Sequence, residues 1–174
     1  LLTLFVALEV LSLPLYILSG LARRRRLLSQ EAAFKYFVLG AFASALLLFG
    51  AVLLYGYSGS LTFEDLMTPA QAMIGYDGLL IAGYILVAVG LLFKIGAVPF
   101  HAWTPDVYQG APSPVTGFMA AGTKAAAVIA LFRVLISAGY ENLETMEPVL
   151  WGITILTMIV GTVIALVQSN IKQM

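Results

Sequence analysis

The chain is organised as five long apolar runs separated by short polar segments. Crossing the hydrocarbon core of a bilayer takes about 20 mostly apolar residues in helical conformation, and each run is long enough. None shows the alternation of a membrane β-strand, and all exceed the length of one. The pattern therefore predicts an all-α, polytopic transmembrane helix bundle that forms a single membrane domain. The predicted spans are 1–21, 32–57, 79–100, 114–138 and 148–168.

Composition supports a lipid environment. Of 174 residues, 61% are hydrophobic and 10% are charged, whereas a soluble domain carries about a quarter charged residues. The net charge is zero and the basic residues form no stripe, so we do not expect a nucleic-acid partner. Without cysteine, disulfides, thiolate metal sites and iron–sulfur ligation are excluded. The chain opens without Met or a basic n-region, so we predict no signal peptide and expect the natural protein to extend beyond both ends.

Basic residues outside the runs lie on alternate polar segments. Arg23–Arg26 are four consecutive arginines after the first run, and Lys172 follows the fifth. By the positive-inside rule, this pattern places 22–31, 101–113 and the C-terminal end in the cytoplasm. A nucleic-acid patch is the alternative interpretation of the arginines, but a run that directly flanks a span favours a topological anchor. The other polar segments carry only acids: Glu64, Asp65, Asp77, Glu141, Glu144 and Glu147.

Five charged residues lie inside the apolar runs, and a charge costs about 3 kcal/mol at the bilayer centre. Lys94 and Lys124 are about 22 Å and 15 Å into their helices at 1.5 Å per residue, too deep to snorkel easily. Lys35 is close enough to a surface to do so. Glu9 is the only acid in any run and is the natural counter-charge for one of the lysines. A purely structural ion pair remains open, and Arg133, near the far end of the fourth run, is interpreted as a snorkelling or pairing residue.

The third run contains a predicted helix break directly after its lysine. Pro99 lacks an amide donor and clashes with the carbonyl four residues earlier, so the helix should kink or break near Ile95. Broken helices at this depth mark ion sites in transporters. His101, the only histidine, excludes a multi-histidine metal site and is a candidate proton relay, because imidazole changes charge near neutral pH. A structural, hydrogen-bonded histidine is the alternative.

Segment 101–113 is predicted to be a structured polar connector at the cytoplasmic interface. Trp103 and Tyr108 fit an aromatic belt at the membrane surface, and Asp106 could cap a helix or pair locally.

One long stretch, 93–112, reads FKIGAVPFHAWTPDVYQGAP and closely resembles the hallmark of a known family. That family comprises the subunit N (subunit 2) type of antiporter-like membrane subunits of proton-pumping NADH:quinone oxidoreductase, respiratory complex I. Three further stretches are similar to it: EVLSLPLY at 9–16, EAAFKYF at 31–37 and QSNIK at 168–172. Val107-Tyr108 stands where the related L and M subunits and multisubunit sodium/proton antiporters usually have Ala-His. Gln173 departs from the basic residue that is common in the family.

The resemblance implies the middle part of a subunit of roughly fourteen helices, about the fifth to the ninth. It assigns Glu9 and Lys35 to a charge pair, Lys94 to the central protonatable site, His101 to the relay and Lys124 to the next carrier. It implies proton translocation in a bacterial inner membrane, alongside other membrane subunits, coupled to quinone reduction elsewhere in a complex that uses NADH and a quinone. We expect no cofactor, metal or redox site in this chain. The alternatives are a sodium/proton antiporter subunit, a non-pumping membrane scaffold and, last because no cofactor motif appears, a quinone-binding enzyme.

Overall fold

The protein is a bundle of long helices in the computed structural model. The model describes residues 1–22, 24, 26–66, 77–137 and 140–173, except for the side chains of 77 and 140–146. Within this described part, five helices are long and apolar enough to cross a membrane, which confirms the predicted all-α architecture. Two boundaries differ from the prediction, because the second span already begins at Arg26 and the third ends at Ile95. The five are Leu2–Ser19, Arg26–Ser58, Gly78–Ile95, Ser113–Ser137 and Glu147–Val167.

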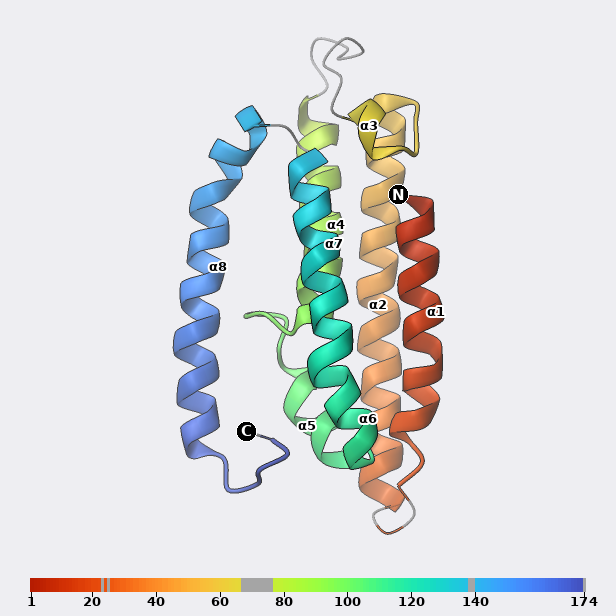
Figure 1. Cartoon of the computed structure of the whole chain (residues 1–174), viewed down its shortest axis with the longest axis vertical. Helices are drawn as coiled ribbons and strands as arrows, with labels where there is room; N and C mark the ends of the chain where they lie inside the picture. Colours follow the sequence, from red (N-terminus) through yellow and green to blue (C-terminus); the bar gives the residue numbers. More distant parts are fainter. Residues whose placement is uncertain (23, 25, 67–76, 138–139, 174) are drawn as a thin grey trace.

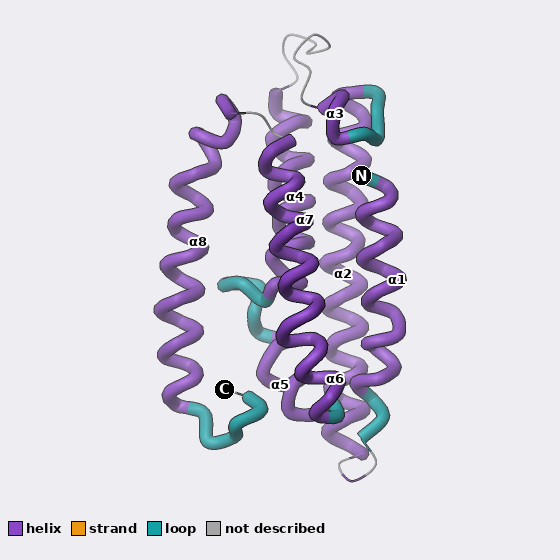
Figure 2. Tube along the Cα trace, in the orientation of Figure 1, coloured by secondary structure: helices purple, strands orange, loops and turns teal. Residues whose placement is uncertain are grey.

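The helices α1, α2, α4 and α7 stand side by side along the long axis of the molecule (Figure 1). Helix α2 is central and packs against α1, α4 and α5, while α8 stands to one side and meets the others mainly through α7. Most loops lie at the two ends of the bundle, but the one between α4 and α5 lies at mid-height (Figure 2). The elements are α1 (Leu2–Ser19), α2 (Arg26–Ser58), α3 (Phe63–Leu66), α4 (Asp77–Ile95), α5 (Trp103–Gly110), α6 (Ser113–Phe118), a π-helical turn (Met119–Thr123), α7 (Lys124–Ser137) and α8 (Tyr140–Val167).

Helices α2 and α4 approach so closely that only glycine fits at the contact. A Cβ atom on Gly50 would lie 2.7 Å from the Val87 nitrogen and 2.8 Å from the Gly83 oxygen. Small residues of this kind allow two membrane helices to pack backbone against backbone. Leu54 and Leu91 are fully buried in the same core. This contact holds α4 rigidly against α2 up to the point where α4 ends.

An aromatic cluster fastens α5 to the same two helices. The Trp103 ring stacks on Tyr36 of α2 at a centroid distance of 4.9 Å and on Phe93 of α4 at 5.4 Å. Its Nε1 donates a hydrogen bond to the Phe93 carbonyl at 3.0 Å. Trp103 is 3% exposed, so the prediction that it lies in an interfacial aromatic belt is wrong. The reason is that segment 103–110 folds into a helix whose apolar face packs inward on α2.

The break after α4 is confirmed, and it has a defined backbone geometry. Gly96 adopts φ +76°, a left-handed conformation that favours glycine. The Ala97 amide donates to the Leu92 carbonyl at 3.0 Å, and the Gly96 amide donates to the Phe93 carbonyl at 3.1 Å. This pair of bonds is a Schellman motif, which terminates a helix. Gly96, three residues before Pro99, therefore ends the helix at Ile95, and the proline is not the cause of the break.

Three segments that were predicted to share one side of the membrane do converge at one end of the bundle. Ala22 and Arg24 line a pocket there together with residues 109–113 and Lys172. The last segment, after α8, is a turn rather than a further helix. Assignment of this end to the cytoplasm stays a prediction. Several residues used for it lie outside the described part of the chain, namely Arg23, Arg25 and the side chains of Asp77, Glu141 and Glu144.

Candidate functional site: a broken helix between two lysines

Lys94 occupies the last turn of α4 and points toward α1. Its Nζ donates to Ser12 Oγ at 2.5 Å and to Tyr16 Oη at 3.4 Å, and it lies 5.5 Å from the centroid of the Tyr16 ring. Only 6% of the residue is exposed. The free carbonyls at the C-terminus of a helix carry partial negative charge and favour a cation there. Hydroxyl groups, a ring face and a helix end thus replace the water that Lys94 loses on burial.

Glu9 lies one helical turn from Ser12 on the same side of α1, because residues three apart are neighbours on a helix surface. Its carboxylate accepts a hydrogen bond from the Ser44 hydroxyl of α2. Glu9, Ser12 and Tyr16 therefore form a polar stripe on an otherwise apolar helix, and the middle and last members hold Lys94. The stripe makes Lys94 the lysine nearest to the Glu9 charge.

Lys35 does not pair with Glu9, so the charge pair implied by the resemblance is wrong in this structure. Lys35 Nζ forms ion pairs with Asp106 of α5 at 2.6 Å and with Glu31 at 2.7 Å. Helices α1 and α2 are antiparallel, and Ser44, not Lys35, lies opposite Glu9. Nine residues separate Ser44 from Lys35, which is about 13 Å along a helix axis. Asp106 was expected to cap a helix or to pair locally. It instead pairs with Lys35 and so joins α5 to α2.

Lys124 begins α7 directly after the π-helical turn and points toward the break from the other side. Its Nζ lies 5.6 Å from the centroid of the Tyr108 ring. A Cβ atom on Gly96 would lie 3.7 Å from Lys124 Nζ and 2.9 Å from Thr104 Oγ1. Lys94 thus faces α1 while Gly96, two residues on, faces Lys124. The break in the α4–α5 helix lies between the two lysines.

His101 lies in the loop of the break and lines a pocket of about 120 Å³. Gly96, Thr104 and Pro105 form the same wall, and Gly161, Ile164, Ala165 and Gln173 of the α8 side form the other. A hydrogen bond from the Val98 amide to Thr157 Oγ1 at 3.0 Å attaches helix α8 to the break. The structure places His101 in this pocket against α8, without a protein partner for its buried Nδ1 among the described residues.

Sequence reasoning missed the groups that surround the lysines. Ser12 and Tyr16 could have been found, because Glu9, Ser12 and Tyr16 have the i, i+3, i+7 spacing of one helix face. Thr104 could not, because its importance depends on how α5 is placed after the break. Among the described residues, no three His, Asp or Glu side chains are grouped so as to hold a metal ion.

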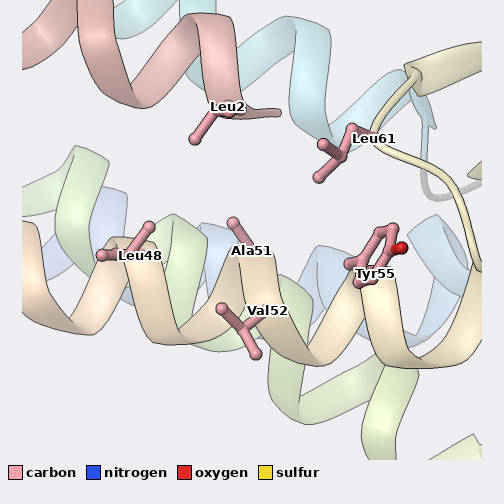
Figure 3. Close-up of a pocket in the computed structure, with 6 residues that line it drawn as sticks. All are labelled: Leu2, Leu48, Ala51, Val52, Tyr55 and Leu61. Atoms are coloured by element: carbon pink, nitrogen blue, oxygen red, sulfur yellow. The ribbon is translucent and has the colours of Figure 1, made fainter.

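A second small pocket lies far from this site and has a different character. It opens between the N-terminal turn of α1 and the upper part of α2 (Figure 3). The residues that line it are apolar except for the Tyr55 hydroxyl: Leu2, Leu48, Ala51, Val52, Tyr55 and Leu61. Such a surface can contact lipid, but it contains no charged residue among those that line it. The broken helix is therefore the candidate site.

Comparison with known proteins agrees with this geometry. Residues 1–174 match the sequence profile of the family described as NADH:quinone oxidoreductase/Mrp antiporter, TM. The chain is 65% identical over 173 residues to NADH-quinone oxidoreductase subunit N of Beutenbergia cavernae, covering 99% of this chain and 33% of that protein.

Solved structures show the same arrangement of helices. A chain of respiratory complex I from Thermus thermophilus is 45% identical with a TM-score of 0.80, over 97% of this chain and 35% of that one. A chain of the Mrp complex from Dietzia sp. DQ12-45-1b is 26% identical with a TM-score of 0.80, over 97% of this chain and 31% of that one. The chain spans about a third of the length of the relatives that it matches.

Proposed function

The chain belongs to the NADH:quinone oxidoreductase/Mrp antiporter transmembrane family, and from this premise we propose that it conducts protons as part of subunit N of an NADH:quinone oxidoreductase. The observation that carries the proposal is the pair of lysines on opposite sides of a helix break, each with its ammonium group directed into the bundle. Broken membrane helices provide such ion sites in transporters. The oxidation of NADH and the reduction of quinone take place in other parts of the complex.

The proposed path runs from Lys94 through His101 to Lys124, with Glu9 as the controlling charge. A carboxylate about 7 Å from an ammonium, at an effective dielectric near 20, attracts it by about 2.4 kcal/mol. Moving or re-pairing that carboxylate changes the equilibrium between the charged and neutral lysine about 50-fold. A switch of this size is enough to make Lys94 release or take up a proton. Lys35 is assigned a positioning role, because its ion pair with Asp106 joins α5 to α2.

The setting of this activity follows from the relatives. The proposed location is the bacterial inner membrane, and the proposed partners are the other membrane subunits of the complex. Many apolar side chains on the outer faces of the helices are exposed in this chain alone, Phe34, Phe42 and Ile129 among them. Lipid, neighbouring subunits and the remaining two thirds of the subunit are the surfaces that would cover them.

The experiment compares Lys94→Met and Lys124→Met in the intact complex. Methionine is apolar and of similar length, so it retains packing and removes the titratable group. We expect either variant to lose proton translocation driven by NADH oxidation in vesicles, whereas Lys172→Met, outside the spans, retains it. Full translocation by Lys94→Met would contradict proton conduction and would favour the non-pumping scaffold.

A sodium/proton antiporter subunit is the second candidate, because the family and the shared helix arrangement include Mrp complexes. The higher identity to subunit N favours the oxidoreductase. Purification of the full-length subunit separates the two functions. An oxidoreductase subunit copurifies with an NADH-oxidising assembly, and an antiporter subunit copurifies with sodium-dependent proton exchange and no NADH oxidation.

A further inference from the structure

Three buried polar atoms of the break have no protein hydrogen-bond partner among the described residues. They are His101 Nδ1, Thr104 Oγ1 and Tyr108 Oη. A buried polar atom that is left without a partner destabilises the folded state. Spaced three and four residues apart, the three atoms share one side of the segment that follows the break. Water molecules are the partners that such buried groups ordinarily take.

Thr104 Oγ1 and Lys124 Nζ both lie close to Gly96. The position of a Cβ atom on Gly96 is 2.9 Å from Thr104 Oγ1 and 3.7 Å from Lys124 Nζ. The two atoms are therefore at most about 7 Å apart, and both lie beside the face of Gly96 that carries no side chain. A single water that accepts from one group and donates to another, with bonds of about 2.8–2.9 Å, joins atoms up to about 5.7 Å apart.

On its other side, Thr104 lines the pocket between the break and α8. The pocket has a volume of about 120 Å³, well above the roughly 10–15 Å³ that one water requires. His101 lines the same pocket, and Gln173 lies at its end near the turn after α8. The Gln173 side-chain amide donates to Gln109 Oε1 at 2.9 Å, and Gln109 lines the neighbouring pocket at the end of the bundle where 109–113 and Lys172 converge.

We propose that the Thr104 hydroxyl is a proton relay that joins Lys124, through one water beside Gly96, to the pocket against α8. This inference rests on the proposed function above. His101, which lines the pocket, releases a proton into its water, and that water protonates Thr104 Oγ1 as the hydroxyl releases its own proton to the bridging water. The bridging water passes one proton to the neutral amine of Lys124, which becomes an ammonium. His101 returns to the neutral imidazole, Thr104 ends as a neutral hydroxyl, and one positive charge has moved from the pocket to Lys124.

The test replaces the hydroxyl without changing the shape of the side chain. Thr104→Val is isosteric, and Thr104→Ser retains the hydroxyl. Both are made in the full-length subunit of the intact complex, and proton translocation per assembled complex is measured in vesicles with NADH as the electron donor. We expect Thr104→Val to lower the rate at least about tenfold, since positioned proton-transfer groups contribute 100-fold or more and water replaces part of that. Thr104→Ser should restore it to within about threefold of the wild type.

Thr123→Val is the matched control. Thr123 is buried beside Lys124, but its hydroxyl is already satisfied by the Met119 carbonyl of its own helix at 2.6 Å. We expect this variant to translocate protons at the wild-type rate. A merely structural Thr104 would alter the amount or thermal stability of the complex in Thr104→Val and leave the rate per assembled complex unchanged, and that result would overturn the inference.

The outcomes also separate this inference from the function on which it rests. If Lys124→Met loses translocation and Thr104→Val retains it, the relay is wrong and the proposed function stands. If Lys124→Met itself retains translocation, the proposed function is wrong. Loss in both, with recovery in Thr104→Ser, supports both.

Discussion

Lys94 and Lys124 lie on opposite sides of the same helix break, but their surroundings differ. The Lys94 ammonium is buried and donates to two hydroxyl groups of α1. Lys124 is half-buried and lies over an aromatic ring, next to polar atoms that find no protein partner in the described part of the chain. Protein atoms solvate the first lysine, whereas the second depends on water.

This difference indicates two tasks. An ammonium group held by fixed hydroxyl groups responds chiefly to nearby charges. For Lys94 that charge is Glu9, which lies one helical turn from Ser12 on the same face of α1. A cation that depends on water exchanges its proton easily with that water. The break separates a site suited to sensing charge from a site suited to proton transfer.

Loss of the Trp103 ring should disrupt the surroundings of both lysines, because this side chain fastens α5 to both α2 and α4. Trp103→Ala is expected to destabilise the subunit by about 3–5 kcal/mol, as buried aromatic truncations do. The measurement is the yield and thermal stability of the assembled complex. Trp103→Phe keeps an aromatic ring between Tyr36 and Phe93 but loses the hydrogen bond and part of the buried ring volume, so a smaller cost of about 1–3 kcal/mol is expected. Wild-type stability in Trp103→Ala would show that α5 is held by other contacts.

Gly96→Ala should damage the Lys124 side selectively. Its φ of +76° makes alanine strained by about 1–3 kcal/mol, and the new Cβ would collide with Thr104 Oγ1. We expect reduced proton translocation in a complex that still assembles. The control is Gly56→Ala in α2, where a Cβ meets no atom within 4 Å and alanine favours the helix. Equal rates in the two variants would mean that the space at Gly96 has no role.

Ser12→Ala and Tyr16→Phe test the two hydroxyl groups that accept hydrogen bonds from Lys94. A hydrogen bond to a charged group contributes about 1.5–3 kcal/mol, so we expect Ser12→Ala to lower the translocation rate about tenfold. Tyr16→Phe should have a smaller effect, because its hydroxyl is 3.4 Å from Nζ and that of Ser12 is 2.5 Å away. Initial rates of proton uptake by vesicles measure both. The reverse order of effects would show that the aromatic hydroxyl is the principal partner.

Asp106→Asn should have the smallest effect. The ion pair of Asp106 with Lys35 is partly exposed, with 46% and 39% of the side chains accessible, and exposed pairs contribute little. Translocation should change by no more than about threefold. A loss of translocation as large as that expected for Lys94→Met would indicate that Lys35 belongs to the proton path.

Much of the fold could be predicted from the sequence because its cause is local. The length and apolarity of the runs predict helices in lipid wherever they occur, and all five are present among the described residues. The break near Ile95 was also predictable, because glycine and proline end helices through their own backbone chemistry. The reason assigned was partly wrong, since Gly96 and not Pro99 provides the terminating geometry.

The partners of the charges were not predictable, because they depend on distances between helices. Lys35 lies 71 positions from Asp106 and Lys94 lies 82 from Ser12, and no local pattern connects such residues. The aromatic-belt prediction for Trp103 failed for a related reason. A tryptophan after a span suits either an interface or a core, and only the packing of α5 on α2 decides between them.

The sequence by itself determined that this protein crosses a membrane as helices, that its third span breaks after a lysine, and that few charges are buried. These follow from hydropathy and backbone sterics, which act over one or two helical turns. The tertiary structure decided which hydroxyl groups hold Lys94, that Glu9 and Lys35 are apart, and that Gly96 lies beside both Lys124 and Thr104. Those features arise where α1, α4, α5 and α7 meet, and only the folded chain brings them together.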